Sequence, residues 1–224
     1  MIGVIADVHG NLPALDAVLA DAPDVDYWIV AGDLVGHLPF ADEVVERVAA
    51  LGSPCVRGNH DHALIGGLDI PGSRSGTIAI REQRSRVSSQ TYSFLESLPL
   101  TWERDDLFLV HGSPFEPLEE RLFALDERVR GWLRGRTLIT GHTHRQLAER
   151  VAEGILVNPG TAGLPTDGDP RSAYAVLRGD AEPELRRVAY DPKPCIERLA
   201  ELGYDDAYAN CLRLGRWVGP SRPG

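Results

Sequence analysis

Residues able to bind metal ions gather in five short segments of the sequence, each directly after an apolar run of the kind that forms a β-strand. The segments combine carboxylate, imidazole and amide groups, and five of the seven histidines of the chain lie in them. Such ligands, without thiolate, suit Mn²⁺, Fe or Zn²⁺ rather than a soft-metal site. The candidate metal ligands are Asp7, His9, Asp33, Asn59, His111, His142 and His144.

A pair of divalent cations would bring phosphoryl chemistry to these residues. Two metal ions about 3.5–4 Å apart can hold both the attacking and the leaving oxygen of a phosphoryl displacement. Asp7 is separated from His9 by one residue, and the same spacing recurs in His142 and His144. Alternate side chains of an extended segment point to the same side, so we expect each pair to present two ligands. We expect two bound cations, with Mn²⁺ preferred and Fe, Zn²⁺ or Ni²⁺ as alternatives.

Each candidate ligand also has an ordinary structural interpretation. Asp7 could cap the following helix, Asp33 could close a turn, and Asn59 could bond to its own backbone. Those roles do not explain why histidines accompany the carboxylates at five strand ends, so metal binding is the preferred interpretation. Two further histidines are different, because a solvated loop position explains them better than metal binding does: His37 and His62.

The elements that must position these residues follow an α/β rhythm, in which short apolar strands alternate with amphipathic helices. Ligands of open α/β sheets bind beyond the carboxyl ends of the strands, so the five segments can converge at one rim. We predict a helical stretch over 75–98, an antiparallel hairpin from 173–177 and 185–190, and a helical tail from about 192 that is broken at Gly203 and fades at Gly219. The strands that precede the candidate ligands are predicted at 2–6, 27–31, 55–57, 107–110 and 137–140, with a further strand at 155–157.

The composition indicates an ordinary globular protein. The 224 residues, 43% hydrophobic and 25% charged, fit a single domain over 1–224. No run approaches the ~18 apolar residues of a membrane span, and no basic leader opens the sequence, so we expect a cytoplasmic protein. The net charge of −10 opposes an extended nucleic-acid surface, and three widely spaced cysteines indicate reduced thiols.

Five motifs, taken in order, resemble those of the calcineurin-like metallophosphoesterase superfamily. They are Asp7-x-His9, Gly32-Asp33, Gly58-Asn59-His60-Asp61, His111-Gly112 and Gly141-His142-x-His144. The likeness to the small YfcE-like prokaryotic phosphodiesterases extends through Asn158-Pro159-Gly160 and 167–171. The resemblance implies a four-layer αββα sandwich with two mixed β-sheets, and metal-dependent hydrolysis of a phosphodiester or phosphomonoester.

The resemblance also implies a role for each matching residue. One cation would be held by Asp7, His9, Asp33 and His144, and the other by Asp33, Asn59, His111 and His142. Asp33 would bridge the two, and a bridging hydroxide would attack phosphorus. His60 would stabilise the developing charge or protonate the leaving oxygen, and Asp61 would orient its imidazole. Asn11 and Arg171 match positions that could contact the substrate.

Some features of the sequence leave the function open in detail. Gly36-His37-Leu38 stands where close relatives often have Gly-Tyr-Gly, so the rim near the second strand could accept a different leaving group. We expect a small phosphate-ester substrate. The alternatives are a dinucleoside polyphosphate hydrolase, a nuclease, and a non-catalytic scaffold of the same fold that binds a protein partner. Retention of Asp33 and His60 speaks against the scaffold. The oligomeric state stays open, a homo-oligomer included.

Overall fold

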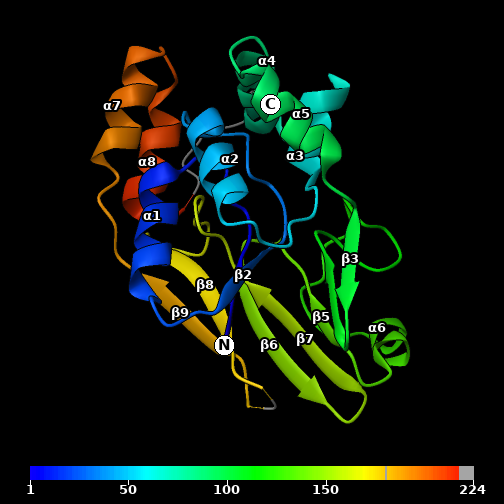
Figure 1. The fold of residues 1–224 in the computed structure, drawn as a ribbon. Helices are drawn as coiled ribbons and strands as arrows, with labels where there is room; N and C mark the ends of the chain where they lie inside the picture. The colour runs from blue at the N-terminus through cyan, green and yellow to red at the C-terminus, as the bar shows by residue number, and fades with distance from the viewer. Residues whose placement is uncertain (180, 217–224) are drawn as a thin grey trace.

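Two mixed β-sheets form the centre of the structure, a computed structural model that describes residues 1–179 and 181–216 (Figure 1). Each sheet contains parallel and antiparallel neighbours. The first has the order β2 (Tyr27–Val30), β1 (Ile2–Ile5), β8 (Ser172–Leu177) and β9 (Glu184–Val188). The second has the order β3 (Thr101–Arg104), β4 (Leu107–Val110), β5 (Thr137–Ile139), β7 (Gly154–Pro159) and β6 (Gln146–Val151).

The alternation of side chains along the strands builds the layers. Val4 and Ala6 face the second sheet and pack in an apolar core with Leu109 and Ile139, whereas Ile5 faces the helices. Val110 of β4 likewise turns away from the first sheet and packs in a separate cluster that includes residues of α6 (Glu127–Leu133). The result is the four-layer αββα sandwich that the resemblance implies.

The remaining helices cover the first sheet and the end of the sandwich where the parallel strands stop (Figure 1). Ser88 accepts a hydrogen bond from the Thr91 backbone and starts a second helix inside the predicted helical stretch 75–98, which is therefore split in two. These helices are α1 (Leu12–Asp21), α2 (Ala41–Ala50), α3 (Asn59–Gly66), α4 (Arg74–Arg84), α5 (Ser89–Ser97), α7 (Lys193–Glu201) and α8 (Asp206–Leu214).

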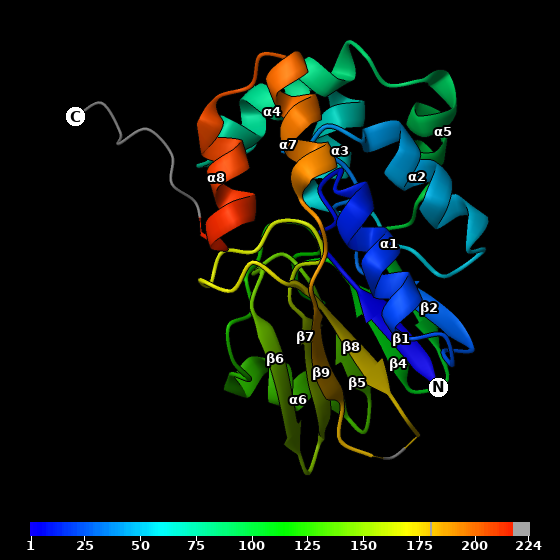
Figure 2. The ribbon, with the colours of Figure 1, turned by 90° about the vertical axis from the view of Figure 1, so that its left-hand side faces the viewer.

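The last part of the described chain confirms two predictions. Strands β8 and β9 pair as an antiparallel hairpin, and the tail from about 192 is a helix pair broken near Gly203. The predicted fading of the tail at Gly219 lies outside the described residues. Figure 2 shows α7 beside α1, and an apolar cluster joins both tail helices to Leu38 and Ala79. In the described part of the chain, no helix is long and apolar enough to cross a membrane.

One predicted strand is reduced to a single bridge. Instead of a strand at 55–57, the structure has one parallel bridge between Val30 and Cys55. Pro54 and Gly58 bound this run, and neither residue favours a strand, so only one ladder position forms. The short run still brings Asn59 and His60 to the same end as the true strands, because it lies parallel to the end of β2.

Candidate metal centre

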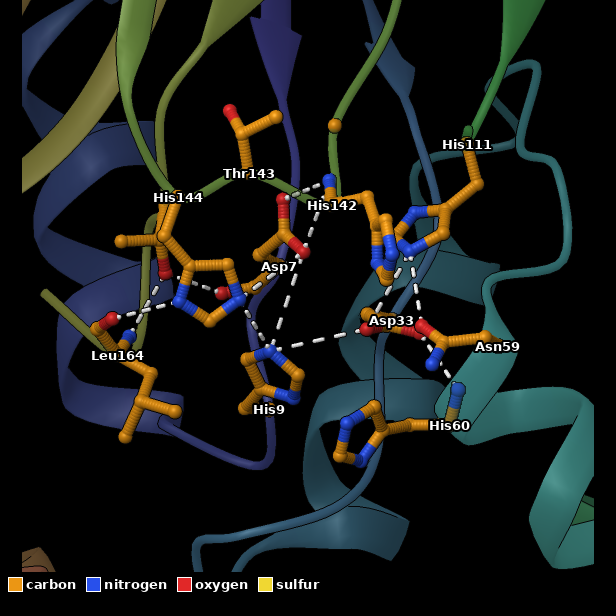
Figure 3. Close-up of polar contacts among 12 residues, drawn as sticks. Asp7, His9, Asp33, Asn59, His60, His111, His142, Thr143, His144 and Leu164 are labelled. Atoms are coloured by element: carbon orange, nitrogen blue, oxygen red, sulfur yellow. Dashed lines mark hydrogen bonds and ion pairs between the residues drawn. The ribbon is translucent and has the colours of Figure 1, made fainter. Parts of the chain in front are cut away.

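The candidate ligands meet at one end of the sandwich, where β1, β2, β4 and β5 stop and α3 begins (Figure 3). Two groups consist of candidate ligands alone, and a third joins His9 to His37 and His60; within each group all ligand atoms lie within 4.8 Å of one another. The first group is Asp7, His9 and His144, and the second is Asp33, His111 and His142. The convergence follows from the strand order, because parallel neighbours deliver their carboxyl ends to one rim.

Hydrogen bonds to the backbone fix the imidazoles of the first group. Nδ1 of His9 lies 3.2 Å from the Val35 carbonyl oxygen, and Nδ1 of His144 lies 3.0 Å from that of Leu164. A carbonyl can only accept, so each Nδ1 carries the hydrogen and each Nε2 presents a lone pair. The two Nε2 atoms face each other at 3.0 Å, and Nε2 of His144 lies 3.3 Å from Oδ1 of Asp7. Three acceptors therefore point into one small space.

The second group repeats this arrangement around His111. Its Nδ1 donates to the Ala31 carbonyl over 2.7 Å, which turns Nε2 toward the group. Nε2 lies 3.1 Å from Oδ1 of Asn59 and 3.4 Å from Oδ2 of Asp33. The same Oδ2 lies 3.7 Å from Nε2 of His9 in the first group. One carboxylate oxygen thus stands between the two groups.

The charges of this buried cluster fit divalent cations. The side chains of Asp7 and Asp33 are almost fully buried, and in the described chain they form ion pairs with imidazoles and with no lysine or arginine. Burial would lower the pKa of His111, but the adjacent Asp33 outweighs it and raises this pKa to about 10. Ligand atoms that share one cation at about 2.1 Å lie roughly 3 Å apart, close to the spacing seen here. A cation would therefore satisfy both the facing lone pairs and the buried carboxylates.

The neutral form of His9 and His142 supports the same conclusion. Burial, with smaller contributions from neighbouring histidines, lowers the pKa of His9 well below its usual range. Burial also lowers the pKa of His142 to about 3, and His111 adds to this effect. A neutral imidazole keeps a lone pair free for a metal ion at ordinary pH.

The paired ligands are oriented toward the cluster by left-handed backbone conformation and not by an extended segment. Asp7 and His9 have φ values of 55° and 51°, and His142 and His144 have 64° and 59°. The expectation that extended geometry places each pair on one side was therefore wrong, although both members of each pair do reach the cluster. Asp33 has the same conformation, with φ of 55°. This region costs most residues roughly 1 kcal/mol or more, and aspartate tolerates it better than most.

The Asp61 carboxylate binds backbone N–H groups. It does not orient the His60 imidazole, which was its expected role. Its carboxylate accepts hydrogen bonds from the backbone N–H groups of Asp33, Leu34 and Val35 at 2.9–3.2 Å, and from that of Gly58 at 2.9 Å. Nδ1 of His60 is buried without a hydrogen-bond partner in the described structure. Asp61 therefore fixes the loop that carries Asp33.

We expect Asp61→Asn to lower the free energy of unfolding by about 2–4 kcal/mol, because an amide has a single acceptor oxygen and cannot accept all four hydrogen bonds. Chemical denaturation followed by circular dichroism measures the change. Asp205→Asn is the matched control, since Asp205 caps α8 by accepting from a single residue, Ala207. It should lose about 1 kcal/mol or less. Equal losses in the two variants would contradict the bracing role of Asp61.

His60 and His37 lie together beside the first group. The ring of His60 is 4.7 Å from that of His9 and 4.8 Å from that of His37, measured between centroids. His37 is buried, so its interpretation as a solvated loop residue was wrong. Tyr208 of α8 lies next to His37, with 6.3 Å between the two ring centroids. His62 is half-buried on α3 rather than in a loop.

The two expected substrate contacts have other partners. Asn11 is buried; its amide nitrogen donates to the Gly163 carbonyl and the Tyr190 hydroxyl, and its oxygen caps α1. Because both the nitrogen and the oxygen of its amide have protein partners, Asn11 has a structural role. Arg171 is exposed and forms a bidentate ion pair with Asp169, in which Nε donates to Oδ1 and Nη2 to Oδ2. Neither residue has a contact with the two ligand groups in the described structure.

Several residues that support the ligands could not be found from the sequence. Burial raises the pKa of the Glu119 carboxyl, and its interaction with the Asn59 side chain opposes this shift. The Glu119 carbonyl oxygen lies 3.1 Å from Nε2 of His142. Nε of Arg121 lies 3.2 Å from the same nitrogen. Both residues stand in an irregular loop after β4, where nothing distinguishes them from ordinary surface charges.

The other end of the cluster is stabilised by polar residues at the end of β7 and in the β7–β8 connection. Asn158 donates to the Gly141 carbonyl over 2.6 Å and so holds the loop of the paired histidines. The Thr161 hydroxyl donates to the Asp7 carbonyl over 2.7 Å. Asn158 belongs to the motif Asn158-Pro159-Gly160, which was the available signal for this role.

Comparison with known proteins gives relatives that match most of the chain. The chain is 31% identical to the uncharacterized protein MJ0912 of Methanocaldococcus jannaschii, over 96% of this chain and 98% of that protein. It is 29% identical to the phosphodiesterase YfcE of Escherichia coli, over 87% and 95% of the two chains. A metallophosphoesterase structure from Sphaerobacter thermophilus superposes with a TM-score of 0.85 at 33% identity, over 96% and 99%.

The family model for the calcineurin-like phosphoesterase superfamily domain matches residues 1–182. This match includes every candidate ligand and ends before α7 and α8. The buried carboxylate and imidazole groups at the strand ends agree with the divalent metals that this family uses. The chain belongs to the calcineurin-like phosphoesterase superfamily and is a hydrolase that acts on phosphoester bonds.

Proposed function

We propose that the chain hydrolyses small phosphodiesters or phosphomonoesters at a binuclear metal centre. The observation that carries the proposal is the position of Asp33, whose Oδ2 lies 3.4 Å from Nε2 of His111 and 3.7 Å from Nε2 of His9. One oxygen can therefore serve both ligand groups. The first cation would be held by Asp7, His9, Asp33 and His144, and the second by Asp33, Asn59, His111 and His142.

Two bound cations would supply positive charge to the phosphoryl oxygens and lower the pKa of water at the site. The residues of the chain orient the site and handle the proton. Asp33 accepts the backbone N–H of His60 through Oδ1 over 2.8 Å, so the same carboxylate that joins the ligand groups also positions His60. His60 would then protonate the leaving oxygen or stabilise its charge.

The metal content tests the proposal directly. We expect the protein reconstituted with Mn²⁺ to retain two metal ions per chain by elemental analysis after removal of free metal. It should hydrolyse bis-p-nitrophenyl phosphate or p-nitrophenyl phosphate, and a chelator should abolish the turnover. A metal content that saturates at one ion per chain would contradict the binuclear centre, and activity that survives complete removal of metal would contradict the mechanism.

A further inference from the structure

A fixed loop brings a positive charge to the second ligand group. The loop runs from the end of β4 to the start of α6 and is closed at its base by the hydrogen bond from the Gly112 N–H to the Pro117 carbonyl, at 2.7 Å. The Ser113 hydroxyl accepts from two backbone N–H groups farther along it. Leu122 and Leu125 are buried in the apolar cluster under α6. Residues 119–121 are thus presented by a segment anchored on both sides.

Arg121 is the cation that this loop places at the site. Its Nε lies 3.2 Å from Nε2 of His142, a member of the second ligand group. The side chain is otherwise exposed, and in the part of the chain that the structure describes it forms no ion pair. The nearby Arg128 behaves differently, because Glu120 and Asp126 neutralise it.

The charges of the guanidinium and of a cation bound at the second ligand group indicate the role of Arg121. A guanidinium beside a metal ligand repels any cation bound there, and this repulsion is stronger next to a buried ligand than in open water. An anion between the two positive charges converts the repulsion into two attractions. A phosphoryl group is such an anion, and a planar guanidinium can donate two parallel hydrogen bonds to its oxygens.

We propose that Arg121 binds a non-bridging oxygen of the phosphoryl group of the substrate. The inference rests on the proposed function, since it assumes that the phosphoryl group lies at the two ligand groups. Arg121 adds a unit of positive charge that a doubly charged terminal phosphoryl group uses more fully than a singly charged diester does. Arg121 therefore favours phosphomonoesters and inorganic phosphate over diesters.

A purely structural role for Arg121 makes a different prediction. If the guanidinium only held the His142 ring, its loss would weaken metal binding and would leave the affinity of the loaded protein for phosphate unchanged. Anion binding has the opposite signature. The metal content should be kept, and the affinity for phosphate should fall.

The test uses Arg121→Gln, Arg121→Lys and the control Arg130→Gln. Arg130 is an exposed arginine of α6, so its replacement changes the net charge equally without touching the site. Isothermal titration calorimetry of the metal-reconstituted protein gives the dissociation constant of inorganic phosphate. Elemental analysis gives the metal content, and steady-state kinetics with p-nitrophenyl phosphate and bis-p-nitrophenyl phosphate give kcat and KM.

We expect Arg121→Gln to weaken phosphate binding by about 10- to 100-fold with two metal ions retained, as the loss of a charge-assisted hydrogen bond implies. KM for the monoester should rise more than KM for the diester. The phosphate affinity of Arg121→Lys should lie between those of the glutamine variant and the wild type. Lysine keeps the positive charge but lacks the two parallel donors of the planar guanidinium. Arg130→Gln should stay within about twofold of the wild type, as an exposed charge remote from the site should.

The inference is overturned if Arg121→Gln binds phosphate as the wild type does, if Arg130→Gln loses as much affinity, or if the metal content falls in parallel. Its failure is distinguishable from failure of the proposed function. If the wild type binds phosphate through Arg121 but hydrolyses no ester, only the proposed function is overturned. If the wild type hydrolyses esters and Arg121 contributes nothing, only the inference about Arg121 is overturned.

Discussion

Asp33→Asn should reduce turnover by roughly 10³-fold or more and should lower the metal content at both positions, because one carboxylate oxygen faces both ligand groups. An amide keeps the size of the side chain and removes the negative charge that two cations would share. The comparison variant is Asp7→Asn, since Asp7 belongs to the first group alone. It should lower the content toward one ion per chain.

Elemental analysis after equilibrium dialysis against Mn²⁺ distinguishes the two variants. Asp69→Asn serves as the control for the substitution itself, because Asp69 is an exposed carboxylate that pairs with Arg81. It should retain two ions and full activity. If Asp33→Asn also retained two ions and full activity, Asp33 would not join the two positions. A loss of one ion in both site variants would likewise argue against a bridge.

His60→Ala should lower kcat by roughly 10²- to 10⁴-fold, the usual contribution of a general acid or base, and should leave the metal content nearly unchanged. The imidazole lies beside the His9 and His37 rings, and these three side chains form a group of their own. His60 belongs to neither of the two groups proposed for the cations, so we expect the cations to stay when it is removed. His62→Ala is the matched control, because His62 lies on the same helix α3, outside these groups. It should change kcat by only a few fold.

The leaving group separates the two roles open to His60. A nitrophenolate leaves without protonation, so His60→Ala should impair its ester less than an unactivated alkyl ester if His60 acts as an acid. Stabilisation of charge alone would affect both esters equally. Steady-state rates on both substrates measure the difference. Wild-type rates on the unactivated ester, or loss of metal comparable with that of His111→Ala, would refute the assignment.

The sequence predicted the position of the site because the rule involved is topological. Residues that follow parallel strands share a rim whatever their exact contacts, so Asp7, Asp33, His111 and His142 could be brought together without side-chain detail. The core was predictable for the related reason that strands alternate their faces. The layers of the sandwich came from the resemblance, since the strand and helix rhythm is compatible with several arrangements.

The conformations and the supporting contacts could not be predicted in the same way. Left-handed backbone at Asp7 and His9 depends on hydrogen bonds with the loop after β2, which is distant in sequence. His37 is buried beside the His60 ring and near Tyr208 of α8, neighbours that no local sequence pattern encodes. Glu119 and Arg121 stand in a loop without periodicity. Their roles arise from tertiary contacts alone.

The positive φ angles at Asp7, His9, Asp33, His142 and His144 also restrict how the metal preference of the centre can change. Glycine, asparagine and aspartate enter this conformation readily, whereas glutamate or cysteine would add backbone strain to any change of ligand. Asn59 and His111 have ordinary backbone, since neither has a positive φ. An engineer who seeks a harder or softer ligand set would therefore begin with Asn59→Asp or His111→Cys. Divergence among natural relatives should follow the same two routes, because they leave the strained loops intact.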